Sequence, residues 1–316
     1  MIDNYDVVVI GGGAAGLSGA IALARSLRTV LVIDAGDPRN APAGHVHNFL
    51  TQDGTPPAEL YRQGRRELAG YGGQVAEARV ESITRDGDRF RVGLGDRLVE
   101  ARRVLVTTGA RDELPDVPGL AERWGRDVLH CPYCHGWEVR GQRVGVLSTS
   151  PAAAHQALLF RQLTDRVTVL AHRGPELTAG QRRQFADLGI TVADGAVVAV
   201  ESADDHLTGV RLAGGAAVGL DAVVVAPVCR ARAELLAPLG LEPAEFRMGD
   251  TLMGTYVAAG PGGSTPVPGL YVAGNIADVQ AQVISAAAAG LMAGAAINAD
   301  LIMTGAAAAT RPSGQI

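Results

Sequence analysis

The chain has 316 residues, which is enough for two domains of ordinary size, and 47% of them are hydrophobic, as in globular α/β proteins. The formal net charge of −5 and the pI of about 5.8 exclude the basic field that a nucleic-acid-binding surface needs. Aromatic residues make up only 4% of the chain, which also argues against a surface for stacking bases.

The sequence carries no pattern that predicts secretion or membrane insertion. Residues 1–3 lead directly into a predicted strand, without the basic and apolar regions of a signal peptide. The most apolar stretch, 283–303, is rich in Ala and Gly and contains Asn298 and Asp300, so we expect a buried helix rather than a membrane span. We therefore expect a cytoplasmic protein with no membrane or nucleic-acid partner.

The first predicted elements are a strand, a helix and a second strand, with a glycine turn after the first. The β-branched run at 5–10 is typical of a parallel strand buried on both faces. The turn at 11–16 follows, then a helix at 17–27 and a strand at 29–33 that ends in Asp34. This order of elements around G-x-G-x-x-G predicts dinucleotide binding, and the alternative is an ordinary tight turn in a parallel sheet.

Each glycine of this turn has its own expected role. Gly11 permits the tight turn, Gly13 lets the backbone approach a pyrophosphate, and Gly16 allows the helix to pack closely on the strand. The helix N-terminus offers unpaired N–H groups to the phosphates. Asp34 lies where a carboxylate would hold a ribose hydroxyl.

A loop, a helix and a meander are predicted next. In the loop at 37–50, His45 and His47 alternate along an extended segment, so we expect only one of them to face a given site. A helix is predicted at 57–70. Alternating apolar and polar residues over 74–100 predict a small antiparallel meander.

The remaining elements predict a second, inserted unit followed by a return to the first. A buried strand at 103–110 leads into a Pro-rich crossover at 111–124. The second unit is predicted as strand 143–147, helix 151–163, strand 166–171, helix 177–188, alternating segment 192–220 and strand 222–228. The strand and glycine turn at 269–275 then mark the return. The fold predicted is α/β, with two Rossmann-like dinucleotide-binding domains of the three-layer ββα type.

The Cys131-x-x-Cys134 pair between these units is the strongest candidate for chemistry. Such a pair opens and closes a small disulfide ring, and its thiols often ionise below the usual pKa of about 8.5. His135 follows the second cysteine and can accept or return a proton at neutral pH. A zinc site is the first alternative, but no second pair exists, because Cys229 stands alone. A structural disulfide is the second, and such bonds are rare in the cytosol.

Over nearly its whole length the chain resembles the low-molecular-weight thioredoxin reductase group of flavoproteins. The residues that carry the resemblance are Gly11-x-Gly13-x-x-Gly16, Thr107-Thr108-Gly109-Ala110, Cys131-x-x-Cys134 and Ala273-Gly274-Asn275 with Gln282. The resemblance implies an FAD-binding domain formed by residues 1–114 and 245–316. It also implies an insert at 115–244 that carries the cysteine pair and resembles an NADPH domain.

By the same resemblance, one set of residues would contact FAD. They are Gly11, Gly13, Ala14, Ala15, Gly16, Asp34, Ala35, Arg39, Asn48, Val80, Thr108, Gly109, Gly274, Asn275, Gln282 and Val283. Family members usually have Asp where this chain has Asn275, and because asparagine keeps an acceptor oxygen we expect FAD binding to persist. No metal site is expected.

The insert departs from the family pattern at its nicotinamide site. Where the family has a glycine turn, this chain has Ser148–Ala153, and Pro151 removes one N–H donor. The family holds the 2′-phosphate of NADPH with a pair of arginines, and this chain has only His172-Arg173 at that place. We therefore expect an insert that does not bind nicotinamide, and an aberrant but working NADPH site is the alternative. With His135 in the place of the usual Asp, the pattern resembles the FAD-dependent dithiol oxidases of the gliotoxin, holomycin and romidepsin type.

The resemblance implies an oxidase mechanism. A small-molecule dithiol, deprotonated by His135, would attack the Cys131–Cys134 disulfide at Cys131, and Cys134 would pass two electrons to FAD. O2 would reoxidise the flavin and give H2O2. Family members are usually homodimers, so we expect one here.

Two other functions remain open at this stage. The first is a thioredoxin-disulfide reductase supplied with electrons by NADPH or another donor such as ferredoxin. The second is a flavin-bound partner or redox sensor without catalysis, although perturbed thiols beside a base usually mark chemistry.

Overall fold

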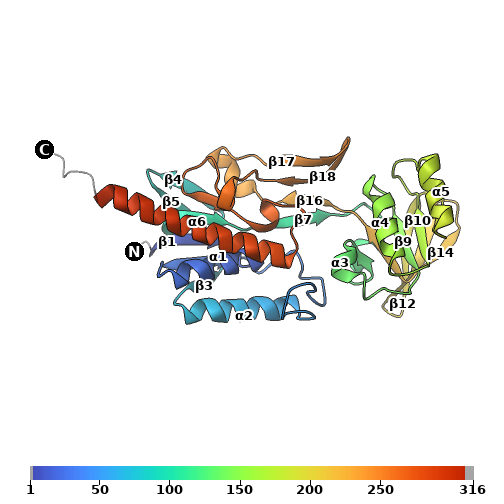
Figure 1. Cartoon of the computed structure of the whole chain (residues 1–316), viewed down its shortest axis with the longest axis horizontal. Coiled ribbons are helices and arrows are strands. Elements are labelled where there is room, and N and C mark those ends of the chain that lie inside the picture. The colour runs from blue at the N-terminus through green and yellow to red at the C-terminus, as the bar shows by residue number, and fades with distance from the viewer. Residues whose placement is uncertain (1–2, 310–316) are drawn as a thin grey trace.

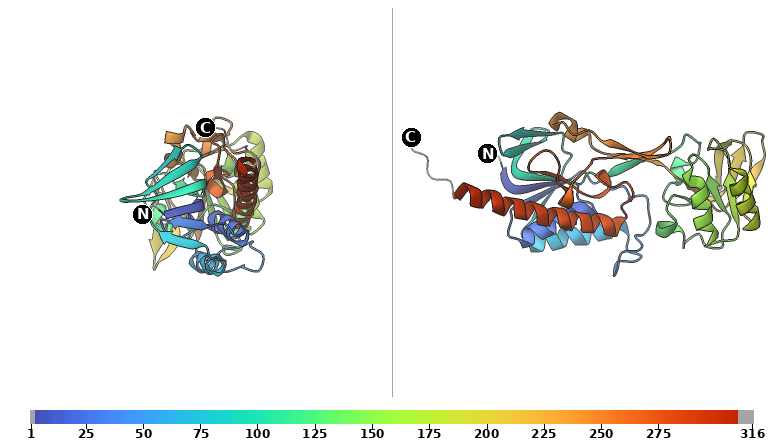
Figure 2. Two further views of the ribbon diagram at one scale, coloured as in Figure 1. Left: turned by 90° about the vertical axis from the view of Figure 1, so that its left-hand side faces the viewer. Right: turned by 45° about the horizontal axis from the view of Figure 1, so that its top comes forward.

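The computed structural model describes residues 3–309, which form an elongated molecule with two lobes (Figure 1). The first lobe is made of residues 3–113 and 228–309, and the insert is made of residues 114–227. The insert lies at one end of the long axis, and the described part of the chain begins and ends in the first lobe (Figures 1 and 2).

The elements follow the predicted order in both parts. The first lobe opens with β1 (Asp3–Ile10), α1 (Ala14–Arg25), β2 (Val30–Asp34), α2 (Pro57–Gly70), β3 (Gln74–Glu77), β4 (Ser82–Asp86), β5 (Arg89–Leu94), β6 (Arg97–Val106) and β7 (Ala110–Glu113). The insert contains η1 (Ala121–Arg123), β8 (Val128–Leu129), α3 (Pro132–His135), β9 (Val144–Leu147), α4 (Ala152–Arg161), β10 (Val167–Leu170), α5 (Ala179–Asp187), β11 (Thr191–Ala193), β12 (Val197–Ala203), β13 (His206–Leu212), β14 (Ala217–Gly219) and β15 (Ala222–Val225). The chain returns through β16 (Val228–Ala231), η2 (Glu234–Leu239), β17 (Ala244–Met248), β18 (Thr251–Tyr256), η3 (Pro261–Gly263), β19 (Leu270–Val272), η4 (Gly274–Ile276) and α6 (Val283–Ala309).

The main sheet of the first lobe has the order β3-β2-β1-β6-β5-β4, and β19 also pairs with β6. β1 lies between two parallel neighbours, β2 and β6, and the side chains of its last four residues are buried on both faces of the sheet. Val8 and Ile10 enter one hydrophobic core, while Val7 and Val9 enter the core on the opposite face. The β-branched run at 5–10 is therefore a central parallel strand, as the sequence predicts.

Helices α1 and α6 cross closely because glycines remove side chains at their contact. A Cβ at Gly290 would lie 1.9 Å from the carbonyl oxygen of Ala15, and one at Gly294 would lie 2.6 Å from that of Gly19. Ala293 and Ile297 of α6 are fully buried against this side of the sheet. The close contact holds α6 beside the helix that begins at the glycine turn (Figure 1).

By length and composition, α6 is the one helix among residues 3–309 that is apolar enough to cross a membrane. Its packing against α1 makes it a core helix of the first lobe instead. Large apolar side chains such as Leu291, Met292 and Met303 nevertheless remain exposed on it, so burial is less complete than the sequence suggests.

The insert is a second Rossmann-type unit. Its parallel sheet has the order β11-β10-β9-β15-β8, and a three-stranded antiparallel sheet, β12-β13-β14, packs beside it. Phe160 of α4 and Phe185 of α5 are buried in its core. The α/β fold with two Rossmann-type domains is thus as predicted.

Two details differ from the sequence-based expectation. The segment 74–100 is not wholly an antiparallel meander, because β3 pairs in parallel with β2 and only β4 to β6 are antiparallel. The chain also re-enters the first lobe earlier than the expected boundary between 244 and 245. β16 pairs with β7 and β18, and Leu236 lies in the core of the first lobe.

Candidate active site

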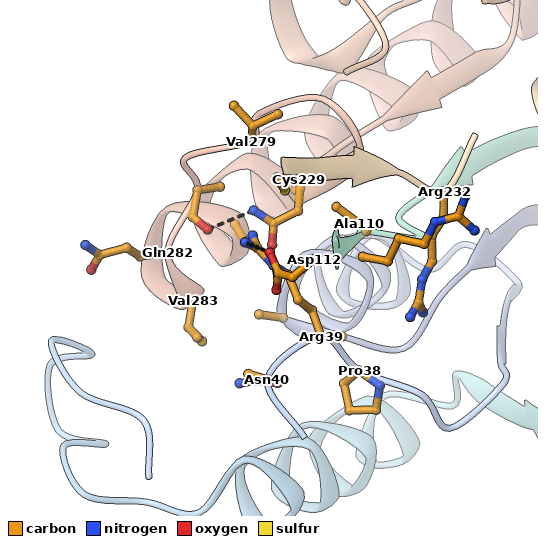
Figure 3. A pocket seen from close by; sticks show the side chains of 18 of the residues that line it. Pro38, Arg39, Asn40, Ala110, Asp112, Cys229, Arg232, Val279, Gln282 and Val283 are labelled. Carbon is orange, nitrogen blue, oxygen red and sulfur yellow. Dashed lines mark hydrogen bonds and ion pairs between the residues drawn. The ribbon is translucent and has the colours of Figure 1, made fainter. Parts of the chain in front are cut away.

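A cavity of about 1,030 Å³ runs from the glycine turn of the first lobe to the cysteine pair of the insert. Both lobes line it, and Figure 3 shows part of its wall around Arg39, Asp112 and Cys229. Its size is at the upper end of the range for small-molecule and cofactor sites, about 300–1,000 Å³. One continuous space thus joins the predicted dinucleotide turn to the predicted redox centre.

The three glycines of the turn differ in what surrounds them. Gly11 has a φ of +103°, and a Cβ there would lie 2.4 Å from the carbonyl oxygen of Thr107. A Cβ at Gly16 would lie 1.9 Å from the carbonyl oxygen of Gly11, so this position needs the close approach of helix to strand. Gly13 has nothing within 4 Å in the direction of a Cβ and lines the cavity. A ligand can therefore reach the backbone at Gly13 and the start of α1.

At the same end of the cavity, Asp34 is held in place by an ion pair. Its Oδ2 lies 2.5 Å from Nη2 of Arg65 on α2, and its side chain borders the position of Gly12. Nearby, Asn40 accepts a hydrogen bond from the hydroxyl of Tyr61 at 2.9 Å, while its own Nδ2 is buried without a partner. Asn40 lines the cavity, so this orphan donor fits a ligand that brings an acceptor.

Most of the residues predicted to bind the cofactor line this cavity. Those that do are Gly11, Gly13, Ala14, Ala15, Asp34, Ala35, Arg39, Val80, Thr108, Gly109, Gly274, Asn275, Gln282 and Val283. Gly16 lies behind the turn instead. Asn48 is used elsewhere, because its Nδ2 donates to the backbone carbonyl of Tyr133 in the insert.

At the polar centre of the cavity wall, the sequence predicted Arg39 but not its partner. Arg39 makes a two-pronged ion pair with Asp112 of β7, with distances of 2.9 Å and 2.6 Å. Cys229 of β16 is buried beside them and lines the same cavity. Burial raises the pKa of the Cys229 thiol, so it stays protonated and behaves as a small apolar group. Asp112 carries no sequence motif and is identified by its pairing alone.

The redox pair lies on the first turn of α3. Cys131 is the residue before the helix, Pro132 begins it, and Cys134 follows one turn later. Both residues are half-buried free thiols that line the cavity. A hydrogen bond from the Cys134 thiol lowers the pKa of Cys131 to about 7, and backbone N–H groups of Cys134 and Tyr133 contribute. The same hydrogen bond, with burial, strongly raises the pKa of Cys134, so the pair carries at most one thiolate near neutral pH.

His135 is half-buried next to this pair and also lines the cavity. Burial lowers its pKa below the usual value, while the charge of Glu138 acts in the opposite direction. Its imidazole is therefore neutral at neutral pH and able to accept a proton. His130, on the other side of the pair, is more deeply buried, and burial lowers its pKa as well.

The loop that carries His45 and His47 contacts the insert beside the redox pair. Both histidines line the same cavity, so the expectation that only one could face a given site is wrong. Val46 between them forms an antiparallel bridge with Thr55, so the backbone is extended here, and side chains two residues apart in an extended segment lie on the same face. Their rings lie 6.2 Å apart.

In the insert, the turn after β9 begins at a buried residue that packs against a neighbouring loop. Ser148 is buried, and a Cβ at Gly174 would lie 2.6 Å from its carbonyl oxygen. Pro151 stands at the N-cap of α4 and makes no side-chain capping bond. The loop around Gly174 thus packs on the first residue of this turn, while Pro151 at its end stays exposed.

The comparisons with known proteins agree with this geometry. The model of the family described as pyridine nucleotide-disulphide oxidoreductase matches residues 5–292. Thioredoxin reductase sirT of Leptosphaeria maculans is 31% identical over 312 residues, covering 93% of each chain. The crystal structure of HlmI has a TM-score of 0.89 at 44% identity, covering 98% of this chain and 95% of that one. The structure of an oxidoreductase from Agrobacterium tumefaciens has a TM-score of 0.88 at 33% identity, covering 95% and 99%.

The chain therefore belongs to the pyridine nucleotide-disulphide oxidoreductases. Within that family it is a low-molecular-weight, thioredoxin reductase-like flavoprotein whose cofactor is FAD. The cavity fits this cofactor, because it offers an open glycine backbone at Gly13 and an unpaired donor at Asn40. Bound in this cavity, which Cys131 and Cys134 also line, FAD would supply a two-electron acceptor.

Proposed function

We propose that this flavin disulfide oxidoreductase is a dithiol oxidase that closes an intramolecular disulfide in a small natural-product dithiol. In this proposal O2 is the final acceptor and H2O2 the second product. One observation carries the proposal. The redox pair opens onto the cavity of the first lobe, while the turn after β9 in the insert has no glycine and its first residue, Ser148, is packed against Gly174.

The roles of the residues follow from their positions. His135, neutral because burial lowers its pKa, takes the proton of a substrate thiol. The resulting sulfur attacks Cys131 of the closed disulfide, the S–S bond breaks, and its electron pair leaves on Cys134. The second substrate thiolate then attacks the mixed disulfide, releasing the cyclic product and leaving two reduced cysteines. The two electrons lost by the substrate now reside on the cysteine pair, and FAD, when bound, would supply their acceptor.

The partners proposed are a small-molecule dithiol and O2, in the cytoplasm. We also propose a homodimer, which the exposed apolar side chains Leu291, Met292 and Met303 of α6 support.

The test is to mix the FAD-loaded protein without oxygen, first with NADPH and then with dithiothreitol. We expect no bleaching of the flavin absorbance with NADPH and rapid bleaching with dithiothreitol. Admission of air should restore the absorbance and produce one equivalent of H2O2. Prompt bleaching by NADPH, or a failure to reoxidise in air, would overturn the proposal. The variant Cys134→Ser is the control and should not bleach.

A thioredoxin-disulfide reductase is the second candidate, because the curated relatives carry that name. It requires that NADPH or a donor such as ferredoxin reduces the flavin. The same anaerobic experiment tests whether NADPH reduces the flavin. Repeating it with reduced ferredoxin in place of NADPH tests the other donor.

A further inference from the structure

A second cavity, of about 430 Å³, lies next to the first on the side of His135. Its volume is within the range of small-molecule sites, about 300–1,000 Å³. Cys131 and Cys134 line only the larger cavity, whereas six residues line both, namely Pro42, His45, His47, Gly125, Leu129 and His135. A molecule in the second cavity therefore lies against the proposed base and beside the space that holds the redox pair.

The walls of the second cavity come from both lobes, and two contacts hold these walls together. Pro42 of the first lobe packs against Gly125 of the insert, where an added Cβ would lie 2.7 Å from the Cβ of Pro42. Asn48 of the first lobe donates a hydrogen bond to the backbone carbonyl of Tyr133. FAD is expected in the larger cavity, so the second one is free to receive the body of a substrate whose sulfurs reach Cys131.

The arginine that lines the second cavity has its charge neutralised within the insert. Arg126 pairs with Asp205, Asp205 also pairs with Arg123, and Arg123 pairs with Asp127. Hydrogen bonds from Arg126 and Arg123 lower the pKa of Asp205 to about 2, so it is ionised at neutral pH. Two arginines thus face two carboxylates. Arg126 uses Nη2 for its pair, and because a guanidinium has several other N–H groups, donors remain for a polar ligand.

Glu138 gives the cavity an excess of negative charge. Its Oε1 lies 3.4 Å from Nε2 of His47, and Nδ1 of the same ring lies 3.3 Å from Oδ1 of Asp53. One imidazolium neutralises at most one of these two carboxylates, so at least one negative charge remains. Within residues 3–309, His47 is the only side chain in an ion pair with Glu138. His135 adds no positive charge, because burial lowers its pKa.

This lining favours a neutral, polar ligand over an anion. A carboxylate on the ligand would be repelled by Glu138, which is 41% exposed and lines the cavity. An amide meets both kinds of partner, because its N–H donates to the carboxylate of Glu138 and its carbonyl accepts from Arg126.

We propose that the second cavity binds the body of the dithiol substrate and that Glu138 makes it selective for neutral dithiols that carry amide groups. The inference rests on the proposed function and names the substrate class of the same site. Glu138 is a specificity-determining residue here, since it contacts the body of the substrate and not the reacting sulfurs.

The experiment compares dihydrolipoamide with dihydrolipoate, two dithiols that differ only in an amide or a carboxylate remote from the sulfurs. Each closes to a cyclic disulfide and gives two electrons to the cysteine pair. The full-length, FAD-loaded protein is mixed with each dithiol without oxygen at low ionic strength, and the rate of flavin bleaching is recorded. A pH of about 8 lies above the usual pKa of histidine, about 6.5, so imidazoles are uncharged.

We expect dihydrolipoamide to bleach the flavin about two- to fivefold faster, the effect of a unit charge about 4–8 Å from another in water. Added salt should reduce this ratio, because it screens exposed charges. A difference that arises from shape alone would not respond to salt.

Glu138→Gln removes the charge and keeps a side chain that can hydrogen-bond His47. In this variant the rate ratio should fall, because dihydrolipoate reacts faster while dihydrolipoamide reacts at an unchanged rate. A merely structural role of Glu138 would change both rates alike. Glu176→Gln is the matched control, since Glu176 is exposed on the insert and lines neither cavity, and it should leave the ratio unchanged.

The other results separate this inference from the proposed function. Equal rates for the two dithiols, a ratio that Glu138→Gln leaves unchanged, or an equal fall in Glu176→Gln would overturn the selectivity and leave the oxidase intact. Bleaching by dithiothreitol but by neither lipoyl dithiol would overturn the assignment of the second cavity. If no dithiol bleaches the flavin, the proposed function fails and this inference fails with it.

Discussion

At the scale of single residues, the chemistry depends on the inequality of two neighbouring thiols. Cys131 has a pKa of about 7 because the Cys134 thiol donates a hydrogen bond to its thiolate. Alkylation of reduced Cys131 by iodoacetamide should therefore rise with pH and reach half its maximum near that value. Removing the donor in Cys134→Ala should move the midpoint upward, toward about 8.5. Cys229, whose thiol pKa burial raises, should stay unmodified and serve as the internal control. An unchanged midpoint in Cys134→Ala would contradict this account.

Residues differ in how far the sequence reveals their roles. The glycine turn was predictable because steric requirements at Gly11 and Gly16 leave room for no other residue, and a spacing rule expresses them. The cysteine pair was predictable for a similar reason, since its chemistry lies within one helical turn. The contact between Asn48 and Tyr133 joins positions 85 residues apart and follows no local rule. The position of the His47 loop beside His135 also depends on contacts between distant parts of the chain, so only the fold reveals it.

At the scale of elements, the contact between α1 and α6 sets the position of the glycine turn. Gly290→Ala places a Cβ against the backbone of Ala15, which has no flexible group to move away. We expect this variant to lose about 1–3 kcal/mol of unfolding free energy, the usual cost of overpacking. FAD affinity should fall as well, because α1 begins at the turn. Denaturant unfolding and flavin titration measure the two effects.

Gly305 of the same helix gives the matched control. A Cβ at this position meets nothing within 4 Å, so Gly305→Ala should be neutral or stabilising by about 0.5–1 kcal/mol. Equal losses in both variants would show that the contact with α1 does not cause the loss, because the higher helix propensity of alanine favours both variants.

Elements with a strong periodic pattern were predicted well, and short ones were not. The helix at 57–70 agrees with α2 at both ends, since a proline begins it and a glycine turn ends it. β3 has four residues, too few to reveal whether its partner runs parallel or antiparallel. The pairing of β7 with β16 could not be predicted from the sequence either, because the two strands belong to the two separate connections between the lobes.

At the scale of the whole molecule, two lobes and an insertion could be read from the order of elements, but the exact boundary could not. The sequence shows where strands and helices alternate, whereas core membership depends on three-dimensional contacts. Leu236 illustrates this, because it follows the last strand of the insert in the chain but packs in the core of the first lobe.

The last prediction concerns how the lobes are held together at the redox pair. Asn48 donates to the carbonyl of Tyr133, and Pro42 packs against Gly125, so the loop of the first lobe holds α3 over the cavity. Asn48→Ala removes a hydrogen bond worth about 1 kcal/mol, which corresponds to an opening equilibrium about fivefold larger. Deuterium uptake in the peptide that spans residues 129–137 should become faster by the same factor. Tyr133→Ala is the control, because the accepting carbonyl belongs to the backbone and stays in place. Faster uptake in Tyr133→Ala than in Asn48→Ala would show that the exposed tyrosine ring, rather than the backbone contact, keeps the lobes together.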